Sequence, residues 1–229
     1  MRYPTTNDQY GPAGAPLNPW FSVWFRPRAT IQYLANTKPM YGFYPIIVLF
    51  GFVYALTLAQ EKQLGDRVSD LNMIFVICLI LGPLAMLAGT YLSAYFLRWA
   101  GKAGEGKASI QDLNTAMVWS YVPLIVPGFL FIPRISMHGV TLFTKKFAKL
   151  DLDSLPPEAL TLEVSNIIAS LVFAVWSLVL LSKMIAYVQG FESGWKGFRN
   201  ILKATVFLFL IVFAVVFVIT VILKVSGVV

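Results

Sequence analysis

Charged residues are scarce in this chain, at 13% of its 229 residues, whereas 58% of the residues are apolar. A soluble domain carries about a quarter charged residues, so this sequence has too little polar surface to cover a water-soluble globule. The apolar residues also fall in long uninterrupted blocks instead of being dispersed. The scarcity of charge therefore excludes a soluble fold and indicates an integral membrane protein.

Cysteine and histidine occur once each, as Cys78 and His138. One cysteine cannot form an intramolecular disulfide, and one histidine provides neither a zinc cluster nor a Ser–His–Asp set. The sequence also lacks a Gly-rich phosphate-binding loop. We therefore expect no catalytic residues, no bound metal and no cofactor, and we predict that the protein is not an enzyme.

Charge is missing altogether from five stretches of the chain, which are 19 to 27 residues long. Crossing a hydrocarbon core of ~30 Å takes ~20 helical residues, and helices satisfy their own backbone hydrogen bonds in lipid. We predict an all-α polytopic membrane protein, a five-helix bundle that forms one membrane domain over 19–229. The predicted spans are about 40–60, 71–98, 113–133, 164–189 and 203–224.

Acidic residues are absent from all five charge-free stretches, although the chain contains eleven of them. An ion-coupled transporter generally needs an ionisable group within the membrane, so the sequence gives no sign of ion coupling. The net charge of +7 comes from basic residues between the spans. We expect these residues to bind anionic lipid headgroups, and we expect no nucleic acid partner.

The basic residues also predict the orientation, because cytoplasmic segments of membrane proteins are enriched in Lys and Arg. With the N-terminus inside, ten basic residues lie in inner segments and seven in outer segments. We therefore predict a cytoplasmic N-terminus and an outside C-terminus. The inner set is Arg2, Arg26, Arg28, Lys38, Arg98, Lys102, Lys107, Lys196, Arg199 and Lys203, and the outer set is Lys62, Arg67, Arg134, Lys145, Lys146, Lys149 and Lys224.

Residues 1–18 are rich in Pro and Gly, and we predict that they form a disordered tail. An interfacial segment follows over about 19–37. Asn18 is a suitable N-cap for its first helix, and Pro19 suits the first helical position.

Aromatic residues and arginines lie together in this segment. Trp20 and Trp24 precede Arg26 and Arg28, a composition that places rings at headgroup depth and guanidinium groups on phosphates. These four residues are the predicted lipid- or partner-binding site. The alternative is a juxtamembrane anchor without lipid selectivity.

The third predicted span contains Pro123, Pro127 and Gly128, and Pro133 follows at its end. An internal proline removes a backbone donor and clashes with the preceding turn, so we predict a helix kink at these residues. Such a kink either lines a transport path or is a packing feature that neighbouring helices accommodate.

The segment after the third span has a second amphipathic pattern, over about 139–150. Three lysines lie off its apolar helical face, which predicts a short basic helix on the membrane surface. His138 precedes it and has no metal-ligand spacing to other residues, so we predict a polar loop residue. The apolar face consists of Val140, Phe143, Phe147 and Leu150.

Small residues recur at four-residue spacing in the first two spans. Such faces let helices approach closely, either within one chain or between two copies. They are Gly51, Ala55 and Ala59 in the first span, and Ala85, Gly89 and Ser93 in the second.

Lys183 is the one charge that intrudes on a predicted span. Near a helix end its side chain can extend to the headgroups. Alternatively, it faces the bundle and pairs with Asp112, which begins the third span on the same side of the membrane. Glu105 in the preceding loop is the second acid within reach.

Several short motifs together resemble the Yip-one domain family of five-span membrane proteins, in particular its short bacterial members. The motifs are Asn18-Pro19-Trp20, Arg26-Pro27-Arg28-Ala29-Thr30, Trp119-Ser120-Tyr121-Val122-Pro123, Trp176-Ser177-Leu178 and Gly190-Phe191. The resemblance implies a multi-pass protein with a cytosolic N-terminus in the bacterial inner membrane. Eukaryotic members of the family bind Rab-type GTPases in secretory membranes. We do not expect a Rab-type GTPase here, because only 39 residues precede the first span.

Two functions are consistent with the sequence. One is a non-enzymatic membrane-organising or partner-recruiting scaffold that resembles trafficking proteins and binds anionic lipid. The other is a small uncoupled transporter or lipid-handling protein with a pathway at the kinked third span. The sequence is consistent both with a homo-oligomer and with complexes with other membrane proteins.

Overall fold

A computed structural model describes residues 17–150 and 155–225, so the predicted tail lies almost entirely outside the described residues. The described chain is helical and contains no strand. Its elements in order are α1 (Pro19–Phe25), α2 (Pro27–Thr37), α3 (Phe43–Glu61), η1 (Leu64–Asp66), α4 (Leu71–Lys102), α5 (Ile110–Ser120), α6 (Val122–Ile125), η2 (Val126–Leu130), α7 (Phe131–His138), η3 (Gly139–Phe143), α8 (Lys145–Ala148), α9 (Pro157–Gln189) and α10 (Gly194–Val225).

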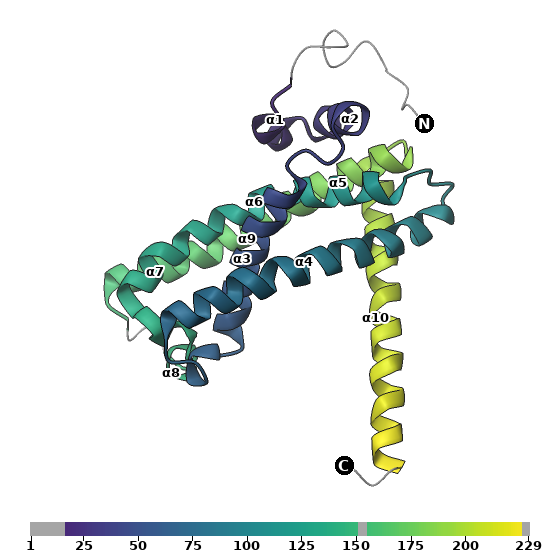
Figure 1. Ribbon diagram of the computed structural model, residues 1–229. Coiled ribbons are helices and arrows are strands. Elements are labelled where there is room, and N and C mark those ends of the chain that lie inside the picture. Colours follow the sequence, from purple (N-terminus) through teal and green to yellow (C-terminus); the bar gives the residue numbers. More distant parts are fainter. Residues whose placement is uncertain (1–16, 151–154, 226–229) are drawn as a thin grey trace.

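Five helical segments are long and apolar enough to cross a membrane, which confirms the predicted five-span all-α fold. They are α3, α4, α9, α10 and the run from α5 to η3. Helices α4 and α9 have 32 and 33 residues. At 1.5 Å per residue each is about 48 Å long, more than the ~30 Å hydrocarbon core requires. A tilt accommodates this excess, and both helices run obliquely to α10 in Figure 1.

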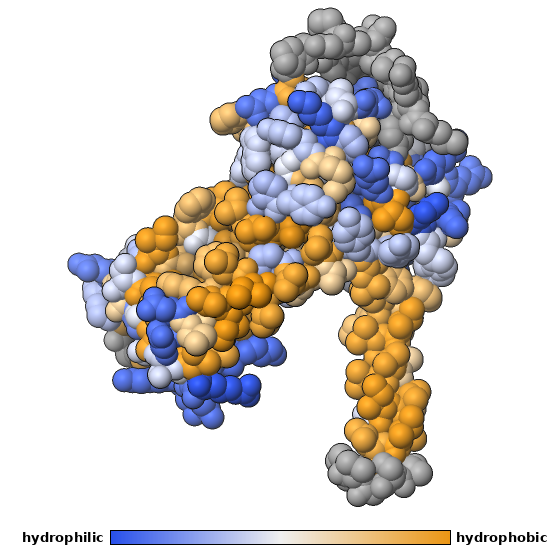
Figure 2. Space-filling view, viewed as in Figure 1, coloured by the Kyte–Doolittle hydropathy of each residue, from blue (hydrophilic) through white to orange (hydrophobic). Residues whose placement is uncertain are grey.

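The two ends of the bundle are polar and the zone between them is apolar (Figure 2). We call one end the α1–α2 face: it carries α1, α2, the 103–109 loop and the α9–α10 turn. We call the other end the η1–α8 face: it carries η1, η3 and α8. Helix α10 packs on α9 and α4 through its first half, while every described side chain over 209–224 is exposed. This second half of α10 is apolar enough to require lipid around it (Figure 2).

Trp119 of α5 is fully buried beneath the α1–α2 face. Its indole N–H donates a hydrogen bond to the carbonyl of Tyr41 at 3.1 Å. Gly42 lies directly over the ring with φ of +71°, and a Cβ there would lie 2.7 Å from Trp119 Cζ2. Glycine is therefore required both for the left-handed backbone and for the close approach that joins α2 to α3.

Helices α3 and α4 touch through small residues, but the contact on α4 lies before the predicted residues. A Cβ added to Gly82 would collide with the Gly51 carbonyl, whereas a Cβ at Gly89 would meet nothing within 4 Å. Gly82 and Pro83 thus form the contact with α3. Ala85 and Gly89 lie further along α4 and are exposed.

The third span is divided at the residues where a kink was predicted. Pro123 lies in the short helix α6, and Pro127 and Gly128 lie in the 3-10 segment η2. A Cβ at Gly128 would lie too close to the Val53 side chain of α3, so the interruption is filled by a neighbouring helix. This contact supports the packing interpretation of the kink at Gly128.

The predicted amphipathic helix over 139–150 is two shorter elements, η3 and α8. They are separated at Thr144, whose extended backbone (φ −113°, ψ 161°) interrupts the helix and whose hydroxyl accepts a hydrogen bond from Phe147 N. Leu142 and Phe143 are buried against α3 and α4, together with Leu56 and Ile74. The prediction of a single surface helix was therefore wrong, because Thr144 caps a second helix within it.

Candidate functional site

The α1–α2 corner positions the predicted site residues. As expected, Asn18 caps α1 by accepting a hydrogen bond from Trp20 N at 3.1 Å, and Pro19 occupies the first turn. Arg26 lies between the two helices, and Pro27 begins α2. The corner is closed where the hydroxyls of Ser22 and Thr30 meet at 2.7 Å.

Trp20 and Trp24 point toward the bundle and not toward the headgroups. Trp20 contacts Trp119 edge-on at 5.1 Å, and Trp24 contacts Phe173 of α9 at 6.1 Å between ring centroids. The rings that point away are Phe21 and Phe25, which are 74% and 84% exposed. The tryptophans therefore anchor α1 to the bundle, and the phenylalanines are the rings available to lipid. That Trp20 and Trp24 also bind lipid or a partner stays a prediction.

Arg26 and Arg28 lie with Lys183 around one hollow of about 310 Å³, which we call the Arg26 hollow. Phe25, Pro27 and Gly194 complete its lining, and none of these described residues is acidic. Arg28 also donates a hydrogen bond to the Glu192 carbonyl at 3.5 Å, which joins α2 to the α9–α10 turn. Three cations from α1–α2 and α9 thus share one hollow, although 155 residues separate Arg28 from Lys183 (183 − 28).

Lys183 and Asp112, which were predicted as a possible pair, have different surroundings. Lys183 is exposed and lines the Arg26 hollow, whereas the Asp112 carboxylate accepts hydrogen bonds from Ser109 and forms a capping box at the start of α5. The exposure of Lys183 agrees with the alternative in which its side chain extends to the headgroups. Its described neighbours in the hollow are two arginines and not an acid.

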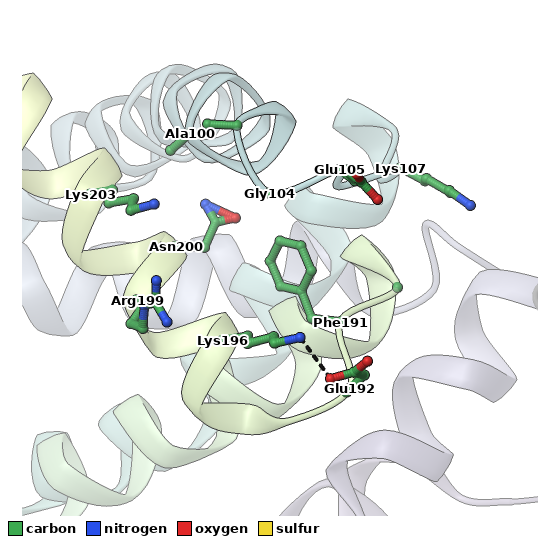
Figure 3. A pocket seen from close by; sticks show the side chains of 12 residues that line it. Ala100, Gly104, Glu105, Lys107, Phe191, Glu192, Lys196, Arg199, Asn200 and Lys203 are labelled. Atoms are coloured by element: carbon green, nitrogen blue, oxygen red, sulfur yellow. Dashed lines mark hydrogen bonds and ion pairs between the residues drawn. The ribbon is translucent and has the colours of Figure 1, made fainter.

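A second hollow, the Arg199 hollow, lies across the α9–α10 turn (Figure 3). It has a volume of about 360 Å³ between the α4–α5 loop and the first turns of α10. Its charged lining consists of Glu105, Lys107, Glu192, Lys196, Arg199 and Lys203. The α1–α2 face therefore has a basic hollow on each side of this turn.

Comparison with known families yields one match: the family model of the Yip1 domain covers residues 21–223. The chain belongs to the Yip1 domain family. Comparisons with curated proteins and with solved structures gave no match. The family match confirms the resemblance seen in the sequence. The matched residues begin within α1 and end within α10, so both hollows lie inside the Yip1 domain.

The η1–α8 face of the Yip1 domain holds a buried ion pair that the sequence analysis missed. Arg134 of α7 donates from Nε and Nη2 to the two oxygens of Glu163 on α9, at 2.8 and 2.7 Å. Their exposed fractions are 2% and 6%. The Arg134 guanidinium also lies 5.2 Å from the Phe131 ring centroid. The pair fastens the third span to the fourth.

His138 completes this buried cluster, although it was predicted to be a polar loop residue. It ends α7, and its Nε2 lies 4.0 Å from Glu163 Oε1. The Phe147 ring packs against it at 4.8 Å between centroids. The predicted fourth span began after Glu163, so a buried ion pair of Glu163 was not expected. Helix α9 begins at Pro157 instead, and Glu163 lies six residues inside it (157 to 163). Pro156-Pro157-Glu158 was the sequence signal for that earlier start.

No three His, Cys, Asp or Glu side chains gather around a common point in the described parts of the Yip1 domain, 17–150 and 155–225. The charged groups that line the two hollows of the α1–α2 face are mainly cations. Guanidinium and ammonium groups at headgroup depth bind phosphate oxygens through charge-assisted hydrogen bonds.

Proposed function

We propose that this Yip1-domain protein is a non-enzymatic membrane-organising scaffold whose α1–α2 face binds anionic lipid headgroups and recruits partners there. The observation that supports it is the Arg26 hollow, in which Arg26, Arg28 and Lys183 lie together without an acidic lining residue. Three cations in one hollow repel each other, and an anion between them removes that repulsion. Lipid phosphates are the anions present at this depth.

The exposed rings strengthen this proposal. Phe21 and Phe25 are four residues apart on α1, so they share the face that the packed tryptophans leave free. Insertion of these rings beside the headgroups would hold the corner at the membrane surface, with Arg26 and Arg28 at phosphate level. Each cation near an anionic surface contributes about 1 kcal/mol to binding.

The orientation and location form part of the same proposal. The α1–α2 face carries the basic inner segments, which favours a cytoplasmic N-terminus and an outside C-terminus in the bacterial inner membrane. The count of ten inner against seven outer basic residues supports this orientation.

A transport pathway at the third span is the less favoured function. The Val53 side chain occupies the space beside Gly128, so the backbone interruption closes against α3. The hollow of about 160 Å³ beside Met117 and Tyr121 is lined mainly by apolar side chains from α4, α5, α9 and α10. A lipid chain could enter it, whereas a polar solute would lose its hydration there.

Lipid selectivity tests the scaffold proposal. We expect the R26Q/R28Q protein in mixed-lipid nanodiscs to retain less phosphatidylglycerol relative to phosphatidylcholine than the wild type at low salt. The expected loss is about 2 kcal/mol, and it should shrink as salt screens the charges. R98Q/K102Q is the matched control, because Arg98 and Lys102 are exposed at the end of α4 and line neither hollow. Equal losses in the two variants would mean that lipid retention depends on the total surface charge and not on the Arg26 hollow.

Cysteine accessibility tests the orientation independently. In intact cells, a cysteine placed at the α9–α10 turn should be labelled only after the membrane is made permeable, while one at η1 should react directly with an impermeant reagent. The reverse pattern would place the α1–α2 face outside and contradict the proposed topology.

A further inference from the structure

The Arg199 hollow has a separate geometry that concerns the first two turns of α10. Lys196, Arg199 and Lys203 occur at positions i, i+3 and i+7, which places them on one side of the helix. In Figure 3 the Lys203 side chain points toward Asn200, which lies on the same helix, while Lys107 extends outward from the facing loop. The cations of α10 therefore form one wall, and Lys107 lies at the rim.

A buried amide cluster fixes this wall against the rest of the bundle. Gln189 Nε2 donates to the Leu97 carbonyl and to Asn200 Oδ1 at 3.2 and 3.1 Å, and Asn200 Nδ2 donates to the same carbonyl at 3.0 Å. Gln189 Oε1 accepts from Ala108 N at 3.3 Å. The ends of α4 and α9, the loop and α10 thus meet at two buried side chains. Arg199 is adjacent to Asn200, so this cluster positions it.

Glycines bring the α4–α5 loop to the amide cluster. A Cβ at Gly101 or at Gly106 would collide with the Gln189 side chain. Gly104 lies beside the Phe191 ring, which forms the apolar part of the lining. The hollow is therefore held open by packing between named elements, and it is not an accidental gap between mobile lysines.

The charge balance within the hollow favours an anion. Four cations face two carboxylates, and Glu192 is bound to Lys196 at 2.7 Å. Among the residues that the structure describes, no carboxylate forms an ion pair with Arg199 or Lys203. Arg199 is a planar multiple donor and Lys203 is a compact charge, a combination that suits tetrahedral phosphate oxygens.

We propose that the Arg199 hollow is a discrete binding site for a phosphate group, carried either by an anionic lipid or by a soluble phosphate ester. Basic pockets between transmembrane helices at the cytoplasmic surface are a recurrent means of binding lipid phosphates. This site is distinct from the diffuse attraction in the proposed function, because it holds one ligand per chain. It uses none of Arg26, Arg28 or Lys183, so either proposal can fail without the other.

Native mass spectrometry of the full chain in neutral detergent tests the site. We expect one equivalent of dioleoyl phosphatidylglycerol to bind in preference to dioleoyl phosphatidylcholine. R199Q/K203Q should weaken this binding by about 30-fold, which corresponds to about 1 kcal/mol for each removed cation. R98Q/K102Q removes the same charge on the same face and should change it by less than about threefold. Equal weakening in both variants, or none in R199Q/K203Q, would overturn the proposal.

Two further arms distinguish the sources of the phosphate. If sn-glycerol 3-phosphate or inorganic phosphate at millimolar concentration displaces phosphatidylglycerol from the wild type, a soluble ligand is indicated. This holds provided that the R199Q/K203Q protein shows no such displacement. Resistance to both, with phosphatidylglycerol still bound, would indicate a lipid. Binding of neither probe class to the wild type would overturn the site.

A gain-of-function variant keeps the proposal testable if R199Q/K203Q folds poorly. E192Q releases Lys196 from its ion pair and removes one of the two carboxylates, so phosphate binding should become stronger by about 3- to 10-fold. E158Q is the matched control, because Glu158 is exposed at the start of α9 on the opposite face. Unchanged or weaker binding by a folded E192Q protein would contradict the proposed site.

Discussion

Glu163 lies six residues from the start of α9, and Lys183 lies six residues from its end, yet their surroundings are opposite. Glu163 is buried, with both oxygens bound to Arg134. Lys183 is exposed beside Arg26 and Arg28. At one end of α9 the charge has its partner within the protein, and at the other end we propose that the partner of the clustered cations is an external anion.

The difference separates two uses of charge in a membrane protein. A buried ion taken from water carries a desolvation cost of several kcal/mol, and it is tolerated only with a partner in good geometry. Exposed cations at a membrane surface have little such cost, so they remain available to phosphates. We therefore expect changes at the η1–α8 face to alter stability, and changes at the α1–α2 face to alter lipid binding.

The largest effect is expected from E163Q. The variant leaves the Arg134 guanidinium buried with a neutral partner, and loss of one partner from a buried pair costs about 3 to 5 kcal/mol. E192Q makes the same chemical change in an exposed pair and should leave the free energy of unfolding nearly unchanged. Unfolding by denaturant in mild detergent measures both. Equal losses would remove the distinction between the two ends.

Replacement of both charges sharpens this test. R134M/E163L substitutes apolar side chains of similar length, and such replacements are often neutral or stabilising. We expect this double variant to recover most of the stability that E163Q loses. A double variant as unstable as E163Q would mean that the pair contributes through hydrogen bonds that packing cannot replace.

An intermediate effect is expected between the two ends, where α3 and α4 pack without charges. G82A places a methyl group against the Gly51 carbonyl, and such overpacking costs about 1 to 3 kcal/mol. G89A is the same substitution on the same helix in open space. Its higher helix propensity should leave stability unchanged or slightly raised. A thermal shift of equal size in both variants would contradict the observed α3–α4 contact.

The smallest effect concerns pH at the Arg199 hollow. The hydrogen bond and the charge of Lys196 hold the pKa of Glu192 below its usual value. The pair is therefore present above the usual carboxyl range and is lost as pH falls through this lowered pKa. Protonation then releases Lys196, and phosphatidylglycerol binding should rise. Glu105 is the other carboxylate that lines the hollow, so E192Q should reduce the rise without abolishing it. An identical pH profile in E192Q would exclude Glu192 as its source.

Much of the fold follows from the sequence, because a charge-free stretch of sufficient length permits only one structure in lipid. The same reliance on charges as boundary markers explains the main error. Arg134 and Glu163 were used to end spans, although mutual pairing allowed both to be buried within the bundle. Sequence spacing cannot show this, since it depends on α7 lying against α9.

The candidate site was predicted in part. Arg26 and Arg28 were identified from their position beside aromatic residues, but α1 has aromatic residues on both sides. Helical periodicity separates Trp20 and Trp24 from Phe21 and Phe25 by about 100° around the helix, without showing which pair packs against the bundle. The approach of Lys183 to the arginines depends on contact between α2 and α9, which no local pattern encodes.

Lipid-dependent stability is the most direct test of the division between the two ends. A lipid that binds only the folded protein raises its stability, so wild-type protein should unfold at a higher temperature in phosphatidylglycerol nanodiscs than in phosphatidylcholine nanodiscs. R26Q/R28Q should lose part of this difference, because the Arg199 hollow stays intact, and it should keep its stability in phosphatidylcholine. E163Q should be less stable in both lipids and retain the difference. If E163Q lost the lipid response and R26Q/R28Q kept it, the division of charges into structural and lipid-binding sets would be wrong.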